Sequence, residues 1–148
     1  MSYSKSIQID AQIEDVWKAW TDSESTEKWL APRANVDFRP GGAWEFFWGD
    51  DPKKDSTLGC VILEVRQAKL LRFEWQGRTA FLHMFLPPGG ERTVIEVRFE
   101  QQGKCTLVTL DHAETRNHPD WAAYQVWMSK AWEMALEALK KHCEAATE

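Results

Sequence analysis

Apolar residues recur at helical spacing through residues 119–143. The residues that fall on one stripe of such a helix are Trp121, Tyr124, Met128, Ala131, Trp132, Ala135, Leu139 and Cys143. Charged residues gather on the opposite face, which is typical of an amphipathic helix with one buried side. These are Lys130, Glu133, Glu137, Lys140 and Lys141. Pro119 suits the first turn of the helix. At about 1.5 Å per residue the helix would be roughly 37 Å long, and it is stable only against a broad apolar surface.

Alternating apolar and polar residues predict a run of strands before this helix. The predicted strands are residues 6–10, 36–38, 44–48, 61–65, 71–75, 95–99 and 108–110. Two stretches with helical spacing, residues 11–20 and a shorter one that ends near Leu30, separate the first strand from the second. Asp22 lies where it can cap the second of these helices. Alternation gives each strand one buried face and one face more exposed to solvent, as in antiparallel sheets. In the strand at residues 61–65 it places Val61, Leu63 and Val65 on the same, buried face.

The predicted elements fit together only if the sheet is curved. Six or seven strands at about 4.8 Å span roughly 30 Å, whereas one helix is only about 10 Å across. The sheet therefore has to curl around the helix, and Gly41, Gly42 and Gly59 permit that bending. We predict an α+β fold in which a curved antiparallel sheet of six or seven strands wraps around a long C-terminal helix. An apolar hollow left between them would suit a small ligand.

Motifs along nearly the whole chain carry a family resemblance. They are IDA at 9–11, VWKAWT at 16–21, Trp29, FRPGGAWEF at 38–46, Gly59, the strand at 71–75 and CTLVTLDH at 105–112. In this order they resemble the START-like superfamily, also called SRPBCC, helix-grip or Bet v 1-like. Within it they resemble the branch named after the activator of the 90-kDa heat-shock-protein ATPase. Two departures are Gln12, where the family usually has a proline, and an apolar insertion at residues 77–91.

The resemblance implies a single START-like domain over residues 1–148 and leaves the function open. Members bind small hydrophobic molecules or, in some branches, cyclise polyketide-like substrates, and eukaryotic relatives act as co-chaperones. The family has no invariant set of catalytic residues to carry over to this sequence. Three hypotheses follow: a non-catalytic carrier or sensor of a small hydrophobic molecule, an enzyme of the cyclase or hydrolase kind, and a module that binds a chaperone.

The amino-acid composition limits the classes of partner and cofactor that we expect for this protein. A net charge of −5 argues against nucleic acid, which binds basic surfaces. No apolar run approaches the roughly 20 residues of a membrane helix. The three cysteines lack metal-type spacing and the four histidines are scattered, so we expect reduced thiols, a cytoplasmic location, no metal and no cofactor. The nine tryptophans indicate either a bulky core or an aromatic-walled pocket.

The sequence contains no catalytic motif of the glycine-rich, HExxH, nucleophile-elbow or CxxC type. Asp111 and His112 are adjacent, but neighbouring strand residues point to opposite faces, so one cannot orient the other as a base. This favours a protein that is not an enzyme, without deciding the question.

The predicted ligand site combines the concave face of the sheet with the buried stripe of the helix. Its residues are Trp44, Phe46, Trp48, Phe73, Trp75, Val97, Leu110, His112, Tyr124, Met128 and Trp132. Tyr124 could supply an orienting hydroxyl, although all these side chains could equally fill a core. The insertion at 77–91 is predicted to be either a lid over the cavity or the contact of a homodimer.

Overall fold

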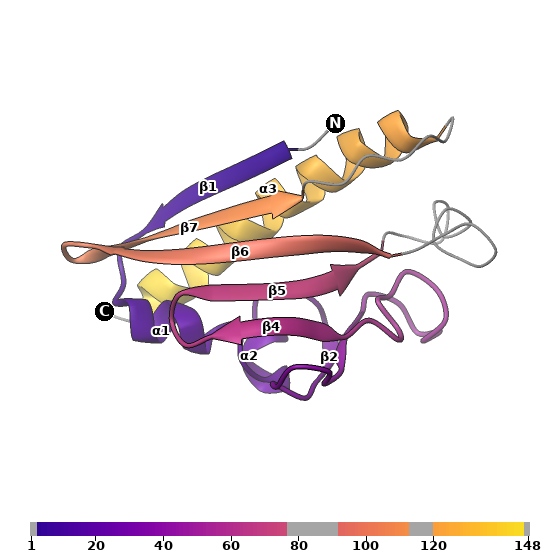
Figure 1. The fold of residues 1–148 in the computed structure, drawn as a ribbon, viewed down its shortest axis with the longest axis horizontal. Helices are drawn as coiled ribbons and strands as arrows, with labels where there is room; N and C mark the ends of the chain where they lie inside the picture. Colours follow the sequence, from indigo (N-terminus) through magenta and orange to yellow (C-terminus); the bar gives the residue numbers. More distant parts are fainter. Residues whose placement is uncertain (1–2, 77–91, 113–119, 147–148) are drawn as a thin grey trace.

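A computed structural model of the chain describes residues 3–76, 92–112 and 120–146 (Figure 1). The elements, in order, are β1 (Tyr3–Ile9), α1 (Ile13–Lys18), α2 (Ser23–Thr26), β2 (Arg33–Val36), β3 (Trp44–Phe47), β4 (Ile62–Arg66), β5 (Leu70–Trp75), β6 (Thr93–Gln102), β7 (Cys105–His112) and α3 (Trp121–Ala146). This is the predicted order, and the predicted α+β class with a long C-terminal helix is confirmed. Pro119 and the insertion at 77–91 lie outside the described residues.

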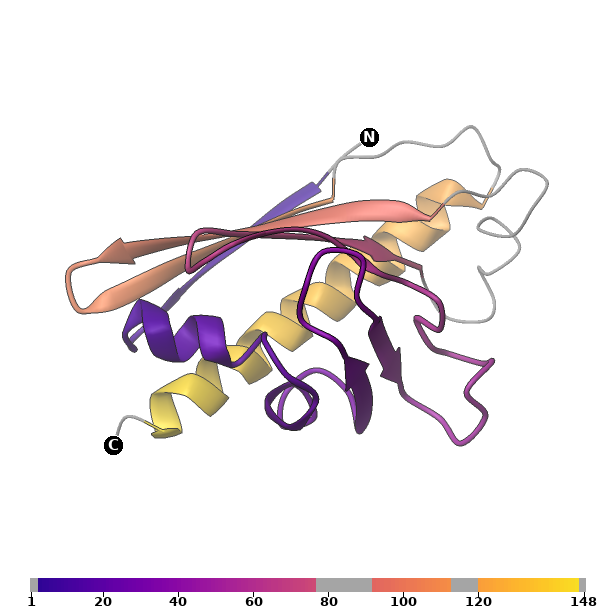
Figure 2. The ribbon, with the colours of Figure 1, turned by 60° about the horizontal axis from the view of Figure 1, so that its bottom comes forward.

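The strands divide between two antiparallel sheets. Five pair in the order β1-β7-β6-β5-β4, and β2 pairs with β3. The second sheet continues from the first, because an isolated bridge joins Ala43 to Val61 and the Trp44 amide donates to the Cys60 carbonyl at 2.9 Å. Figure 2 shows β2 and β3 standing at an angle to the larger sheet, on the side where α3 lies. The seven predicted strands are therefore present and antiparallel among the described residues, but a single bridge, and not a full ladder, links the β2-β3 pair to the larger sheet.

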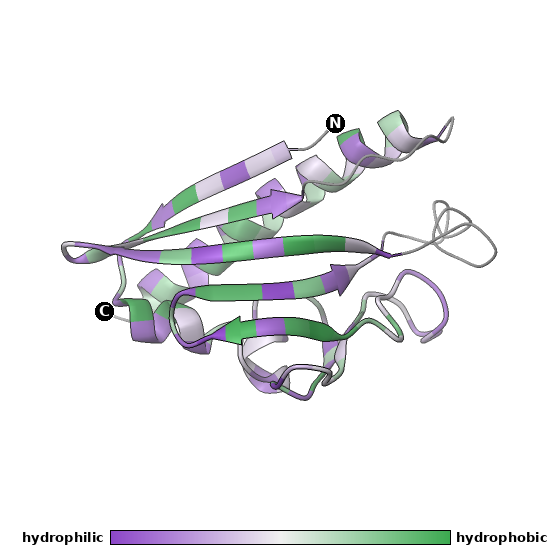
Figure 3. Cartoon of the chain, viewed as in Figure 1, coloured by the Kyte–Doolittle hydropathy of each residue, from purple (hydrophilic) through white to green (hydrophobic). Residues whose placement is uncertain are grey.

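Helix α3 runs diagonally across one face of the five-stranded sheet (Figure 2). The predicted stripe faces the core: Ala131 and Ala135 are partly buried, its other members are buried, and Leu136 is an additional buried member. The strands present alternating hydrophobic and hydrophilic residues along their length (Figure 3). In β5 the buried residues are Leu71, Phe73 and Trp75, as the alternation predicts. Burial of these large side chains supplies the apolar surface that a helix of this length needs.

The predicted shared face of Leu63 and Val65 in β4 does not form, because only Val65, opposite the buried Leu71, packs against the core. Ile62 is fully buried, whereas Leu63 is 40% exposed. The pairing register shifts between Ile62 and Glu64, because Ile62 pairs with Phe73 and Glu64 with Arg72. Leu63 is therefore the extra residue of a β-bulge, which adds a residue to one strand and changes the face that the following side chains occupy. The prediction that Leu63 shares the buried face was wrong for this reason.

The short helices are shorter than predicted. The Asp22 side chain accepts a hydrogen bond from the Ser25 amide at 2.6 Å and caps α2, as the sequence suggests.

At the other end of the chain, α3 covers the outer edge of β1. Lys140 donates to the Gln8 carbonyl at 3.0 Å, and Glu144 accepts from the Asp10 amide at 2.9 Å. These contacts satisfy backbone groups on a strand edge that would otherwise be open to pairing.

Candidate functional site

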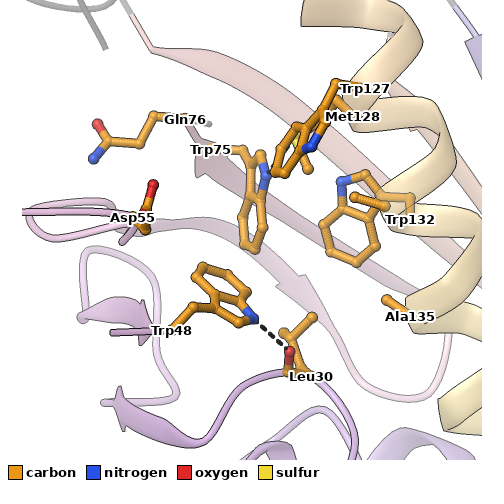
Figure 4. A pocket seen from close by; sticks show the side chains of 10 residues that line it. Leu30, Trp48, Asp55, Trp75, Gln76, Trp127, Met128, Trp132 and Ala135 are labelled. Carbon is orange, nitrogen blue, oxygen red and sulfur yellow. Dashed lines mark hydrogen bonds between the residues drawn. The ribbon is translucent and has the colours of Figure 1, made fainter. Parts of the chain in front are cut away.

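A pocket of about 330 Å³ lies between α3 and the sheet edge (Figure 4). Its lining residues come from the end of β5, from the segments after α2 and β3, and from α3. They are Leu30, Trp48, Asp55, Trp75, Gln76, Trp127, Met128, Ala131, Trp132 and Ala135. This volume lies at the lower end of the range for small-molecule sites. The pocket lies between the helix and the sheet, where the curved-sheet argument predicts a hollow.

Four of the ten described lining residues are tryptophans, and two of their rings are held by their own N–H groups. The Trp48 Nε1 donates to the Leu30 carbonyl at 3.0 Å, and the Trp75 Nε1 donates to the Met128 sulfur at 3.3 Å. The rings of Trp48 and Trp75 lie 6.0 Å apart at 76°. Those of Trp75 and Trp132 lie 4.8 Å apart at 48°. Three rings therefore enclose the space from different directions (Figure 4).

Trp48 differs from the other predicted aromatic residues because it is 42% exposed. Strand β3 ends at Phe47, and Trp48 begins the loop that returns to β4. An isolated bridge between Phe47 and Ser56 closes this loop, and the Trp48 amide donates to the Asp55 carbonyl at 3.2 Å. Asp55 has a φ of 49°, a left-handed conformation that aspartate tolerates better than most residues. The loop thus brings Trp48 and Asp55 to the same pocket.

The other polar lining residue, Gln76, is engaged within the protein. Its Nε2 donates to the Ser56 carbonyl at 2.9 Å, and its Oε1 accepts from the Arg92 Nε at 3.1 Å. Arg92 also donates to the Leu58 carbonyl and lies 3.8 Å from a Glu74 carboxylate oxygen. Gln76 is therefore a fixed part of the wall. Asp55 is the one ionisable side chain among the described residues that line the pocket.

Four predicted ligand residues line this pocket: Trp48, Trp75, Met128 and Trp132. The others pack in the core with almost no exposure and are not among its described lining: Trp44, Phe46, Phe73, Val97, Leu110, His112 and Tyr124. Sequence reasoning placed Ala131 and Ala135 on the helical stripe but not in the site, and it missed Leu30, Asp55, Gln76 and Trp127. Trp127 carried a signal, because it precedes Ala131 and Ala135 by four and eight residues and so shares their helical row.

A buried polar cluster lies on β1, β7 and α3. The Tyr3 hydroxyl and His112 Nδ1 share a hydrogen bond of 2.8 Å, and the His112 and Tyr124 rings lie 6.2 Å apart. Burial and then the neighbouring Tyr124 hold the pKa of Tyr3 far above its usual range, so its phenol stays protonated. Asp111 faces the other side of the sheet, where Arg98 donates to it at 2.8 Å. The predicted separation of Asp111 from His112 is confirmed.

Three buried indole N–H groups, those of Trp20, Trp44 and Trp132, have no hydrogen-bond partner among the described residues. Each of these rings packs against Phe73, at centroid distances of 6.4, 4.8 and 6.4 Å respectively.

Within the described ranges no group of histidine, cysteine or acidic residues could hold a metal ion. None of the helices described is long and apolar enough to cross a membrane.

Comparisons with known proteins agree with this architecture. The family model for activator of Hsp90 ATPase homolog 1-like protein matches residues 10–144. A solved structure of CalU16 from Micromonospora echinospora is 25% identical with a TM-score of 0.69, covering 99% of this chain and 78% of that one. MLL2253 from Mesorhizobium loti is 19% identical with a TM-score of 0.75, covering 96% of each chain. No curated protein matches the chain.

A further solved structure, the Aha1 dimer from Colwellia psychrerythraea, is 18% identical with a TM-score of 0.74. The match covers 97% of this chain and 96% of that one. At 19% and 18% identity, the structures from Mesorhizobium loti and Colwellia psychrerythraea show similarity of fold alone. These matches support the helix-grip architecture predicted from the motifs.

Proposed function

This chain belongs to the family of activator of Hsp90 ATPase homolog 1-like proteins, and we propose that it is a non-catalytic carrier or sensor of a small hydrophobic molecule. The observation that carries the proposal is the pocket of about 330 Å³ between α3 and the sheet. Its walls are mainly indole rings and alanine methyl groups, and two of the indoles are fixed by hydrogen bonds. Such preorganised apolar walls lower the ordering cost of binding.

The lining argues for binding rather than for catalysis. General acid–base chemistry needs at least two titratable groups that converge on the substrate. Asp55 is the only ionisable side chain in the described lining, and neither Tyr3 nor His112 is among the described lining residues. A cyclase or hydrolase is the alternative, and it predicts turnover that depends on Asp55. Loss of a measured activity in Asp55→Asn, without loss of ligand binding, would favour that alternative.

Ligand-dependent stabilisation tests the proposal. A ligand at 100 times its Kd stabilises the folded state by about 2.7 kcal/mol, which raises the Tm of a chain of this size by roughly 5–10 °C. A library of small hydrophobic compounds should contain members that produce such a rise. If no member moves the Tm, the proposal fails.

A matched pair of variants assigns the binding to this pocket. Ala135→Leu places three extra carbon atoms in the pocket wall, whereas Ala123→Leu makes the same change at an exposed position of the same helix. Both residues favour helices, so the backbone effect is small. The first variant should reduce the ligand-induced rise in Tm and the second should leave it unchanged. Equal responses would place the ligand elsewhere.

Two further partners remain proposals. The similar structure from Colwellia psychrerythraea is described as a dimer, which supports self-association of this chain, although the predicted contact at 77–91 lies outside the described residues. Native mass spectrometry would measure the subunit number directly. The name of the matched family supports a chaperone as a partner. A pull-down with a bacterial-type chaperone, in the presence and absence of ligand, would test that role.

A further inference from the structure

The pocket continues onto an apolar groove on the outer side of α3. This surface, the α3 groove, encloses about 680 Å³ and shares Trp127 and Ala131 with the pocket. The rest of its described lining also comes from the helix: Ala122, Ala123, Val126, Lys130 and Met134. Because two residues belong to both hollows, a ligand that fills the pocket can extend past Trp127 and lie along the surface of the helix.

Two large apolar side chains of the α3 groove are unusually exposed. Val126 is 73% exposed and Met134 is 69% exposed, more than any other large apolar residue that the structure describes. Packing against the sheet does not account for them, because both lie on the solvent side of α3. Single exposed apolar residues are normal on a protein surface, but a contiguous set beside a hollow is typical of a binding site.

The position of charge gives the ligand a direction. Among its described lining residues the α3 groove has one cation, Lys130, and no carboxylate. Lys130 is exposed and forms no ion pair with a described residue, whereas Glu133, almost one turn further on, is 3.5 Å from Lys5. The described lining of the pocket contains no lysine, arginine or histidine. An anionic group therefore finds its partner in the groove, and the apolar part of the same molecule points inward.

We propose that the ligand is a long-chain amphiphile with an anionic head, of the fatty-acid carboxylate class. The end of its chain fills the pocket, the middle crosses Trp127 and Ala131, and the head lies at Lys130 in the α3 groove. This inference rests on the proposed ligand-binding function and assigns the chemical class of the ligand. A compact hydrophobic molecule would fill the pocket alone and leave Val126 and Met134 uncovered.

A series of carboxylates tests whether one chain occupies both hollows. An extended dodecanoate is longer than the roughly 10 Å width of a helix, so it can contact both the pocket and Lys130, whereas hexanoate cannot. A half-buried methylene group adds about twofold to affinity. Over six methylene groups we expect dodecanoate to bind roughly 60-fold more tightly than hexanoate. Titration of the isotope-labelled protein below the micelle concentration, followed by its amide resonances, gives each Kd.

Probes of opposite charge test the position of the head. The protein has a net charge of −5, so its overall field favours dodecyltrimethylammonium over dodecanoate. A local contact with Lys130 should reverse this order and make dodecanoate bind about threefold more tightly, the size of an exposed ion pair. Lys130→Gln should remove the preference. The matched control, Lys141→Gln, makes the same charge change on an exposed residue of α3 outside the groove and should retain it.

Variants of the walls test the path of the chain. Met134→Gln keeps an unbranched side chain with good helix propensity at an exposed position, so it should fold. It should weaken dodecanoate about threefold and leave hexanoate unchanged. Ala135→Leu, in the pocket, should weaken dodecanoate as well. Ala123→Leu leaves compounds that fill only the pocket unaffected, but it should alter the affinity for dodecanoate because Ala123 lines the α3 groove.

The outcomes distinguish this inference from the function on which it rests. If affinity does not rise with chain length, or if dodecyltrimethylammonium binds more tightly than dodecanoate, the inference is overturned, while a rise in Tm with compact compounds still supports a carrier or sensor. If Ala135→Leu leaves dodecanoate unaffected, the chain lies outside the pocket and the inference is overturned. Cosedimentation with phosphatidylglycerol vesicles, without binding of free dodecanoate, would make the groove a membrane contact and would also overturn it. If neither dodecanoate nor any library compound binds, both proposals fail together.

Discussion

Thr57 is the residue through which the loop carrying Asp55 is attached to β3. Its side chain is fully buried and makes two hydrogen bonds with the strand. The Phe46 amide donates to the Thr57 hydroxyl at 2.9 Å, and that hydroxyl donates to the Trp44 carbonyl at 3.0 Å. The Thr57 amide in turn donates to the Phe46 carbonyl at 2.9 Å. One hydroxyl therefore replaces the partner strand for two backbone groups of β3.

Thr57→Val keeps the shape of the side chain and removes the hydroxyl. Two backbone groups in a buried strand then lose this partner, at roughly 1–2 kcal/mol each. The added methyl group returns about 0.8–1 kcal/mol through burial. We expect a net loss of about 2 kcal/mol in the free energy of unfolding. For a chain of this size that corresponds to a fall in Tm of roughly 4–8 °C.

Urea unfolding measures this change, provided that the midpoint moves while the slope stays constant. Thr93→Val is the matched control, because Thr93 is also fully buried but its hydroxyl donates a single bond, to the Trp75 carbonyl at 3.1 Å. After the same gain from the added methyl group, it should cost only about 0.5 kcal/mol, roughly a quarter as much. Thr57→Ser keeps the hydroxyl and should lose only the contribution of one methyl group. The reasoning is refuted if Thr57→Val is no less stable than Thr93→Val.

Two predictions concern titratable groups. The Ser25 amide that donates to Asp22 holds the pKa of this carboxyl below its usual range. The stabilisation by this cap is therefore complete above the ordinary carboxyl pKa and is lost as the pH falls through the lower folded-state pKa. Asp22→Ala should cost about 1 kcal/mol at pH 7 and progressively less below about pH 4, as measured by urea unfolding across pH. Burial raises the pKa of the Cys60 and Cys143 thiols to about 12, whereas Cys105 is only half-buried. Iodoacetamide at neutral pH should alkylate Cys105 first in the native protein, and mass spectrometry that finds Cys60 or Cys143 modified as fast would contradict this.

Periodicity alone determined the elements and most of the buried faces. A helical stripe from Trp121 to Cys143 and the alternation of Leu71, Phe73 and Trp75 each specify which side chains point inward. These patterns follow from 3.6 residues per turn in a helix and two in a strand, so they can be read without knowledge of the partners. The need for a curved sheet, and hence for a hollow, also followed from the widths of the elements.

The tertiary structure decided which inward-facing residues enclose the hollow. Trp44 and Trp48 are four residues apart, so regular alternation would place them on the same face of one strand. Trp44 is fully buried, whereas Trp48 lines the pocket, because β3 ends between them. The bulge at Leu63 reverses one face, and a left-handed turn brings Asp55 beside Trp48. Periodicity specifies the direction of a side chain but not its distance from the helix across the sheet. That distance depends on where strands end and bend, which is settled only when the whole chain packs.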